Sequence, residues 1–259
     1  MVIKFDWDRN RRQGIVSGDF FPNIREHFSV KNEGAVFARY RGGFAPSRKY
    51  AITPGGRFDP GLFYCINDFL QESNYEGQIV MTKDFTDNMS VKYEFENTSK
   101  LKLELRDYQS DIIDKCLVNG KGVVVLATAG GKTLTIASLL ESIYNDNKDF
   151  TCVLIVPDLG LVEQTVADFK DYGVNFTYSK WTGKNELDLG KNVVVCNLGI
   201  IQSSKSDTDW LRYIDVCIVD EVHKLRRGNK VNNLFRLINT QHKFGFTGTM
   251  PEEKIDPVI

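Results

Sequence analysis

The sequence has no hydrophobic run long enough to cross a membrane and no secretory signal pattern near its amino terminus. It holds five cysteines among 259 residues, and none of them lies in a Cys-x-x-Cys or Cys/His cluster. We therefore expect buried free thiols in a reducing compartment, with neither zinc nor disulfides. These absences predict a protein of the cytoplasm, the host cytoplasm if it is viral, without a membrane partner.

Charge of one sign is not in excess either, because the net charge is −1 at pH 7. Any affinity for nucleic acid must therefore come from local basic patches and not from the overall charge. Hydrophobic residues make up 42% of the chain and charged residues 26%, which is typical of a globular protein. The length suits one large domain or two ordinary ones.

The most informative stretch begins with the apolar run Val123–Ala127 and ends in Gly130-Gly131-Lys132-Thr133. A buried strand followed by a glycine-containing turn and a helix is the pattern of a phosphate-binding loop. Glycines let the backbone approach phosphate oxygens, and the first turn of a helix offers unpaired N–H groups. We expect Lys132 to reach the β- and γ-phosphates of a nucleotide and the Thr133 hydroxyl to bind Mg²⁺. An ordinary strand–turn–helix is the plainer alternative.

A second apolar run, Val216–Val219, is followed directly by Asp220 and Glu221. In open α/β sheets, ligands bind at the carboxyl ends of the strands, where these two carboxylates would lie. We expect Asp220 to hold Mg²⁺ and Glu221 to orient and deprotonate the attacking water. The two stretches together predict a site for nucleotide hydrolysis that uses ATP and Mg²⁺.

The pattern of apolar and polar residues divides the chain into three segments. Residues 1–82 have the mixed periodicity of a small α+β domain, and residues 83–100 are polar and read as a linker. From residue 101 onward, apolar runs alternate with stretches of helical spacing, and Gly120 ends the first helix. This alternation predicts an α/β domain over residues 101–259, with a mostly parallel sheet covered by helices on both faces.

The small domain contains a stretch with basic and aromatic residues but no acidic residue, between Ala35 and Phe58. Arginine beside aromatic residues suits phosphate contact combined with base stacking. We therefore expect nucleic-acid contacts from Arg39, Arg41, Arg48 and Lys49. The alternative is a solvated strand face above core aromatics.

The order of motifs resembles that of superfamily 2 helicases of the Asp-Glu-x-His type. The matching segments are Leu105–Gln109 (Q motif), Thr128–Thr133 (motif I), Pro157–Gln164 (motif Ia), Asn197–Gln202 (motif Ic), Asp220–His223 (motif II) and Thr247–Thr249 (motif III). This resemblance implies a RecA-like fold and an ATP-dependent helicase. It covers about residues 101–251, and Asp158 stands where motif Ia usually has threonine.

The resemblance also implies a role for each matching residue. Arg106, Tyr108 and Gln109 would contact the adenine side of the nucleotide, and the loop residues Thr128, Ala129, Gly130, Gly131, Lys132 and Thr133 its phosphates. His223 would link the nucleotide site to Thr247, Gly248 and Thr249, which couple hydrolysis to domain movement. Pro157, Gln164 and Gln202 would contact nucleic acid. For Gln109 a solvent-facing helix position is the alternative, and for His223 an ordinary loop histidine.

The amino-terminal part resembles the small domain of the UvsW family of recombination helicases from T4-type bacteriophages. The shared features are the arginine- and aromatic-rich segment around Arg39–Tyr50, the Pro60–Leu62 helix entry and the Q motif near residue 105. This resemblance implies a partner that is branched or single-stranded DNA or an R-loop, which contains an RNA–DNA hybrid. It also implies a role in recombination, replication and repair.

Helicases of superfamily 2 have a second RecA-like domain with an arginine finger, and no such domain follows Thr249 in this sequence. We therefore expect half of a motor, which needs the other half in cis or in trans. Two alternatives stay open. One is the motor portion of a restriction-type DNA translocase, and the other is a DNA-binding module that keeps the fold without turnover.

Overall fold

The computed structural model describes residues 1–11, 13–32, 35, 46–89, 100–127, 129–203, 207–224, 238, 240 and 242–249. These residues form two compact units, one from the first 89 residues and one from residues 100–249. Each unit has its own hydrophobic core, so each is described by itself.

The first unit is built on a four-stranded mixed sheet in the order β5-β2-β1-β6. Strand β1 pairs antiparallel with β2 and parallel with β6, while β2 pairs antiparallel with β5. A separate antiparallel ribbon joins β3 to β4, with Lys31 opposite Arg48. The strands are β1 (Val2–Asp8), β2 (Gln13–Gly18), β3 (Ser29–Lys31), β4 (Arg48–Tyr50), β5 (Arg57–Phe58) and β6 (Gln78–Met81).

Among the described residues of this unit, the helices are α1 (Phe21–His27), α3 (Leu62–Glu72) and α4 (Lys83–Met89). Helix α4 lies in the segment that the sequence analysis assigned to a linker. Its Phe85 is fully buried in the aromatic core of the first unit, where its ring meets those of Phe5 and Phe63. The Phe85 side chain thus anchors the otherwise polar helix α4 in the core of the first unit. We therefore propose that the first unit ends after residue 89.

The second unit contains a six-stranded sheet in the order β7-β12-β11-β8-β10-β9, in which every neighbouring pair is parallel. Alternation of strands with helices along the chain produces this arrangement, because parallel neighbours need a crossover. The strands are β7 (Lys121–Val125), β8 (Cys152–Val156), β9 (Tyr178–Trp181), β10 (Val193–Asn197), β11 (Val216–Asp220) and β12 (His242–Thr247).

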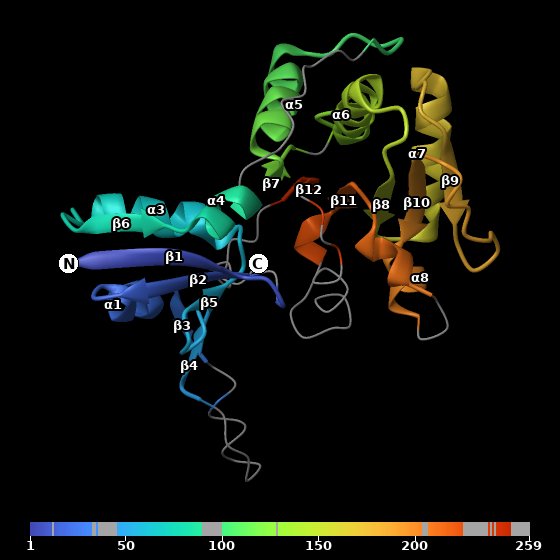
Figure 1. Ribbon diagram of the computed structural model, residues 1–259. Helices are drawn as coiled ribbons and strands as arrows, with labels where there is room; N and C mark the ends of the chain where they lie inside the picture. The colour runs from blue at the N-terminus through green and yellow to red at the C-terminus, as the bar shows by residue number, and fades with distance from the viewer. Residues whose placement is uncertain are drawn as a thin grey trace. The chain divides into compact units, whose positions relative to one another are not determined.

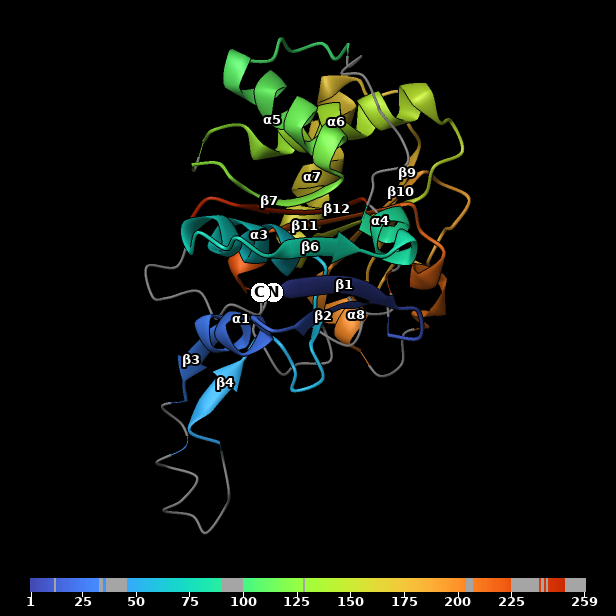
Figure 2. The same ribbon diagram turned by 60° about the vertical axis from the view of Figure 1, so that its left-hand side comes forward.

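Helices cover both faces of this sheet, as the sequence predicted, and Figures 1 and 2 show α5 and α6 on the side opposite α8. The helices are α5 (Asp107–Asn119), α6 (Lys132–Asp146), α7 (Leu159–Tyr172) and α8 (Leu198–Gln202), with short 3₁₀ turns η1 (Asp209–Arg212) and η2 (Val222–Lys224). Gly120 ends α5 at a positive φ of 68°, a conformation that glycine adopts without a Cβ penalty.

Strand β7 differs from the expectation of a buried strand. It forms one edge of the sheet, and its Val123 and Val125 side chains are 54% and 50% exposed, while Val124 packs on the core. The valines of β7 therefore indicate a preference for strand conformation, and they do not indicate that both faces of the strand are buried.

The thiols follow the sequence prediction with one exception. Four of the five cysteines are buried and free, but Cys65 is exposed. Burial raises the pKa of Cys116 to about 12, which makes its thiol a poor nucleophile. Within the described residues, no helix combines the length and apolar character of a membrane span.

Candidate nucleotide-binding site

The loop between β7 and α6 has the backbone shape that close approach to an anion requires. Ala129 and Gly131 both have positive φ, 66° and 78°. The Gly130 N–H donates to the Ala127 carbonyl at 2.8 Å, which closes the turn. Helix α6 then begins at Lys132, so the unpaired amides of its first turn and its positive dipole end lie directly after the loop. Thr128 lies outside the described residues.

Thr135 is part of this loop's support, and the sequence analysis did not single it out. Its buried hydroxyl donates to the Gly131 carbonyl at 3.1 Å, and its backbone N–H donates to the same oxygen at 3.0 Å. The spacing of four residues from the loop glycine is the signal that could have identified it, because threonine in a helix often bonds the carbonyl four residues back.

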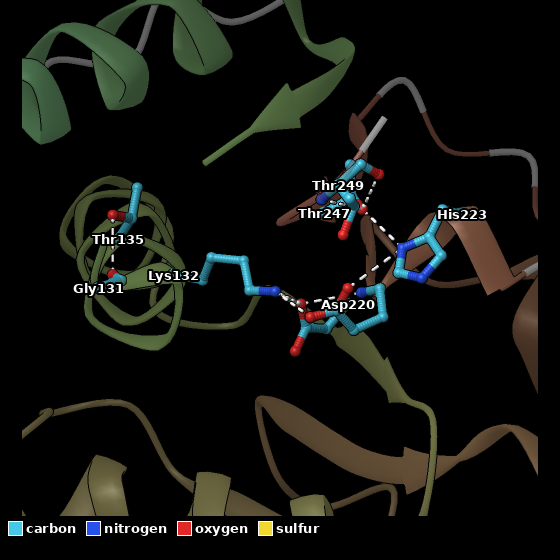
Figure 3. Close-up of polar contacts among 8 residues, drawn as sticks. Gly131, Lys132, Thr135, Asp220, His223, Thr247 and Thr249 are labelled. Atoms are coloured by element: carbon cyan, nitrogen blue, oxygen red, sulfur yellow. Dashed lines mark hydrogen bonds and ion pairs between the residues drawn. The ribbon is translucent and has the colours of Figure 1, made fainter. Parts of the chain in front are cut away.

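The structure brings the loop and the acidic pair together. Strand β11 ends at Asp220, and the Asp220 Oδ1 lies 3.6 Å from the Lys132 Nζ. Glu221 forms an ion pair with the same ammonium group. Figure 3 shows Lys132 reaching from the loop toward Asp220. The lysine expected on phosphate and the carboxylate expected on Mg²⁺ therefore face each other at the carboxyl edge of the sheet.

The two carboxylates have opposite electrostatic environments. Burial raises the pKa of Asp220, and this effect exceeds the opposing effect of Lys132. Burial also acts on Glu221, but hydrogen bonding and charge attraction from Lys132, with His223 adding to them, hold its pKa below the usual value. Glu221 is therefore ionised at neutral pH and can accept a proton from water.

The side chains present suit Mg²⁺ bound with a nucleotide. Mg²⁺ is usually held by one or two carboxylates together with phosphate oxygens and water, and not by a cage of protein ligands. Asp220 supplies one carboxylate, and Thr133 supplies a hydroxyl at the start of α6. No group of three or more His, Cys, Asp or Glu that could hold a metal by itself occurs within the described part of the chain.

His223 connects the acidic pair to the end of β12. Its Nδ1 lies 2.7 Å from the Thr247 Oγ1 and 3.2 Å from the Glu221 Oε2 (Figure 3). The Thr247 hydroxyl donates to the Thr249 carbonyl at 2.9 Å, so it accepts from His223, whose Nδ1 carries the hydrogen. The Gly248 N–H also bonds the Glu221 carboxylate. These contacts join Lys132, Glu221 and the Thr247–Thr249 segment in one network through His223.

The three residues expected at the adenine side lie around the start of α5. Arg106 donates from Nη1 to the Tyr108 hydroxyl at 3.0 Å, and that hydroxyl donates to the Gly130 carbonyl at 3.1 Å. The Gln109 side chain is only 3% exposed, so the solvent-facing alternative is wrong. The Q-motif segment thus contacts the phosphate loop directly.

Two of the residues expected to contact nucleic acid lie at the same edge of the sheet in the second unit. Pro157 follows β8 and Gln202 ends α8 after β10, and these two strands are parallel neighbours. Gln164 is exposed on α7. Asp158 caps α7 by accepting from the Leu161 N–H at 3.0 Å.

In the first unit, Arg48 and Lys49 are exposed on β4. The Arg48 guanidinium forms an ion pair with Glu26 at 3.1 Å. Arg39 and Arg41 lie outside the described residues.

Comparison with protein families identifies the family of the second unit. A family model described as "Type III restriction enzyme, res subunit" matches residues 102–252. The chain belongs to this family. The res-subunit match spans the Q motif, the phosphate loop, the acidic pair and the Thr247–Thr249 segment described above.

Similarity to individual proteins extends over both units. The ATP-dependent DNA helicase uvsW of Enterobacteria phage T4 is 28% identical over 250 residues, which are 90% of this chain and 49% of that protein. The chain therefore spans about half the length of this curated relative. Together with the family match, this confirms the resemblance of the chain to superfamily 2 helicases and to the amino-terminal half of UvsW.

Solved structures support the fold. A crystal structure of the UvsW helicase from bacteriophage T4 has a TM-score of 0.76 at 23% identity, with 100% of this chain and 96% of that chain covered. A second T4 UvsW structure has a TM-score of 0.73 at 24% identity, covering 96% and 53%. A Sulfolobus solfataricus SWI2/SNF2 ATPase core in complex with dsDNA has a TM-score of 0.54 at 15% identity, covering 64% and 36%. The RecA-like α/β fold with a preceding small domain is thereby confirmed.

Proposed function

We propose that the chain is the ATP-binding half of an ATP-dependent DNA helicase or translocase that acts on branched DNA or R-loops in recombination, replication and repair. The observation that carries this proposal is the meeting of Lys132 with Asp220 and Glu221 at the carboxyl edge of the sheet. The similarity to uvsW, which is named an ATP-dependent DNA helicase, supports the choice of DNA as partner. A second RecA-like domain, in cis or in trans, would complete the motor.

Each side chain then has a role in phosphoryl transfer. Lys132 and the amides at the start of α6 would bind the phosphates, and Thr133 and Asp220 would hold Mg²⁺. When bound, the ion neutralises charge on the phosphate oxygens. Glu221, ionised because of its low pKa, would orient the attacking water and accept its proton. His223 would transmit the state of Glu221 to Thr247 through its Nδ1–H.

A second candidate has support of its own. The family match carries the description of a type III restriction enzyme res subunit, which favours a restriction-type DNA translocase motor. Such a motor shares the nucleotide site and differs in its DNA: it would translocate on linear duplex without a preference for branches. DNA preference therefore separates the two candidates.

The first experiment titrates a fluorescent, non-hydrolysable ATP analogue with Mg²⁺ into the wild type and Lys132→Ala. We expect the wild type to bind and the variant to lose at least about tenfold in affinity, since a charged partner of the phosphates is removed. Equal binding by both proteins would refute the nucleotide site. Bound nucleotide without measurable turnover, even after a second RecA-like domain is supplied, would instead support the idle DNA-binding module.

The second experiment compares binding of a four-way junction, an R-loop and a linear duplex of equal length. The helicase proposal predicts tighter binding of the branched substrates and a common loss in the double variant Arg48→Ala, Lys49→Ala. Equal affinity for all three would favour the restriction-type motor. Unwinding by the 259-residue chain alone would contradict the expectation that it is half of a motor.

A further inference from the structure

Three aromatic side chains of the first unit form a layered stack that reaches the surface. The ring of His27, the last residue of α1, stacks on the Phe69 ring of α3, with 3.9 Å between the ring centroids and 21° between the planes. The ring of Phe20 also stacks on Phe69, at 6.2 Å and 22°. Phe20 and Phe69 are half-buried, whereas His27 is exposed. The stack therefore ends in a ring that solvent reaches.

The fold uses the imidazole of His27 as a flat ring and not as a polar group. In the part of the chain that the structure describes, this ring contacts the rings of Phe28 and Phe69, and no hydrogen bond or ion pair holds its nitrogens. Parallel, offset stacking is a favoured arrangement of aromatic rings. A nucleobase has the same flat π face and stacks on aromatic side chains whatever its sequence. The exposed face of His27 therefore suits one more ring, that of a base.

Cationic side chains lie on the β3–β4 ribbon, which begins two residues after His27. Lys31 on β3 is exposed and lies opposite Arg48 on β4. Arg48 reaches back toward α1, because its Nε donates to the Ser29 Oγ at 3.0 Å and its Nη1 pairs with Glu26 at 3.1 Å. A guanidinium group has five N–H donors, so further donors remain for a phosphate oxygen. The exposed ring thus adjoins a group that can bind phosphate.

The charges around the stack also give the nucleic-acid backbone a direction. Asp68 and Glu72, which lie next to Phe69 and one turn after it on α3, are both exposed. These carboxylates would repel phosphates, so a strand whose base lies on His27 would carry its backbone along the ribbon and not along α3. Aromatic rings beside a positively charged path are the usual elements of single-strand binding.

We propose that His27 is a stacking site for an unpaired base of single-stranded DNA, with an adjoining phosphate bound by Arg48. The inference rests on the proposed function, since it takes DNA as the partner, and it names the feature of that DNA which the first unit selects. A base inside a duplex is already stacked on both faces and cannot lie on His27. Single-stranded tails and the displaced strand of an R-loop do offer such bases.

Two substitutions separate stacking from packing. His27→Leu keeps an apolar cover on Phe69 but removes the ring, whereas His27→Phe keeps a ring. The probe is a hairpin whose single-stranded tail contains 2-aminopurine, a base whose fluorescence falls when it stacks. We expect the wild type to quench this fluorescence, and His27→Leu to lose the quenching and bind about 5- to 150-fold more weakly, as when one stacked base is lost. His27→Phe should retain both properties.

Salt dependence and a paired reference separate the base contact from the phosphate contact. His27→Leu should leave unchanged both the affinity for a continuous duplex and the slope of log K against log salt. Arg48→Ala should weaken binding of tail and duplex alike and reduce that slope by about one. Tyr64→Leu removes an exposed aromatic ring of α3 outside the stack and is the matched control, with no change expected. Thermal unfolding of each variant reports whether the fold is retained.

Two results would overturn the proposal. One is equal affinity and equal quenching of the tailed hairpin by the wild type and His27→Leu. The other is a loss of the same size for tail and duplex in His27→Leu, which would make His27 a structural support of the ribbon. In both cases the wild type still binds DNA, so the proposed function stands and only the stacking site fails. A wild type that bound neither substrate would refute the DNA partner as well.

Discussion

The ion pair between Lys132 and Glu221 leads to a counterintuitive prediction for Glu221→Gln. In the free chain the Lys132 ammonium group contacts Glu221 and lies 3.6 Å from the Asp220 Oδ1. A triphosphate must take this lysine from the carboxylates, so the pair competes with nucleotide. We therefore expect Glu221→Gln to bind nucleotide more tightly than the wild type, while hydrolysis, which needs the carboxylate, falls by orders of magnitude.

The structure sets the size of this gain. The two side chains are 16% and 21% exposed, so water screens their interaction only in part. A hydrogen bond to a charged group contributes about 1.5–3 kcal/mol net, against about 1 kcal/mol for a neutral one. Replacing the carboxylate with an amide that keeps one hydrogen bond therefore removes about 0.5–2 kcal/mol of competition. The expected gain in affinity is about 2- to 30-fold.

The assay is equilibrium titration of a fluorescent, non-hydrolysable ATP analogue, which excludes apparent tightening from slow turnover. A parallel titration with fluorescent ADP separates two causes. If the gain comes from freeing Lys132, ADP shows it as well, whereas repulsion between Glu221 and a γ-phosphate would affect only the triphosphate. Asp84→Asn, which removes a carboxylate from the ion pair with Arg9 in the first unit, is the charge control and should leave both affinities unchanged.

The reasoning would be refuted by equal or weaker binding of the ATP analogue to Glu221→Gln in a protein whose thermal unfolding matches that of the wild type. A gain seen with the triphosphate but not with ADP would also reject competition for Lys132, because the pair must break for either ligand.

Three further predictions concern stability. Phe85→Ala should lower the free energy of unfolding of the first unit by about 3–5 kcal/mol in chemical denaturation, because it deletes a fully buried ring; an unchanged midpoint would place α4 outside that core. Burial and the charge of Lys243 lower the pKa of Lys121 from 10.5 to about 8. Above about pH 8 the unfolded chain therefore binds more protons than the folded chain. As the pH rises from about 7.5 to 9.5, the Tm of the wild type should rise relative to the Tm of Lys121→Met. A constant difference between the two Tm values over this pH range would contradict the prediction. Burial lowers the pKa of His242 below 6.5. The unfolded chain therefore binds more protons than the folded chain below about pH 6.5, and the Tm of the wild type should fall there more than that of His242→Phe. An equal fall of the Tm in both proteins would contradict this prediction.

The parallel sheet was predictable because its signal is local. Runs such as Val216–Val219 are apolar throughout and helices alternate with them, so the edge that carries Asp220 follows from chain direction alone. The meeting of Lys132 with Asp220 was expected on the same ground. Such features depend on the spacing of apolar residues and on the direction of the strands, and both can be read from a single sequence.

Other features depend on contacts between distant segments and left no local signal. The burial of Phe85 is decided by Phe5 and Phe63, which belong to β1 and α3. The exposure of Val123 is decided by the order of strands, since an edge strand and a central strand can share the same valine-rich sequence. A single sequence read by periodicity cannot distinguish these cases.

Glu221 is the sharpest example of a residue shaped by its surroundings. Its φ is 53°, in a region that costs an ordinary side chain about 1–2 kcal/mol. The contacts of its carboxylate with Lys132, His223 and the Gly248 N–H offset this cost, and all three partners are distant or follow the strand end. Strain at such a position persists only where neighbouring groups determine the conformation. Because the strain and the lysine contact act on one residue, a ligand that removes Lys132 also removes part of what holds Glu221, so the conformation after β11 is coupled to occupancy of the phosphate loop.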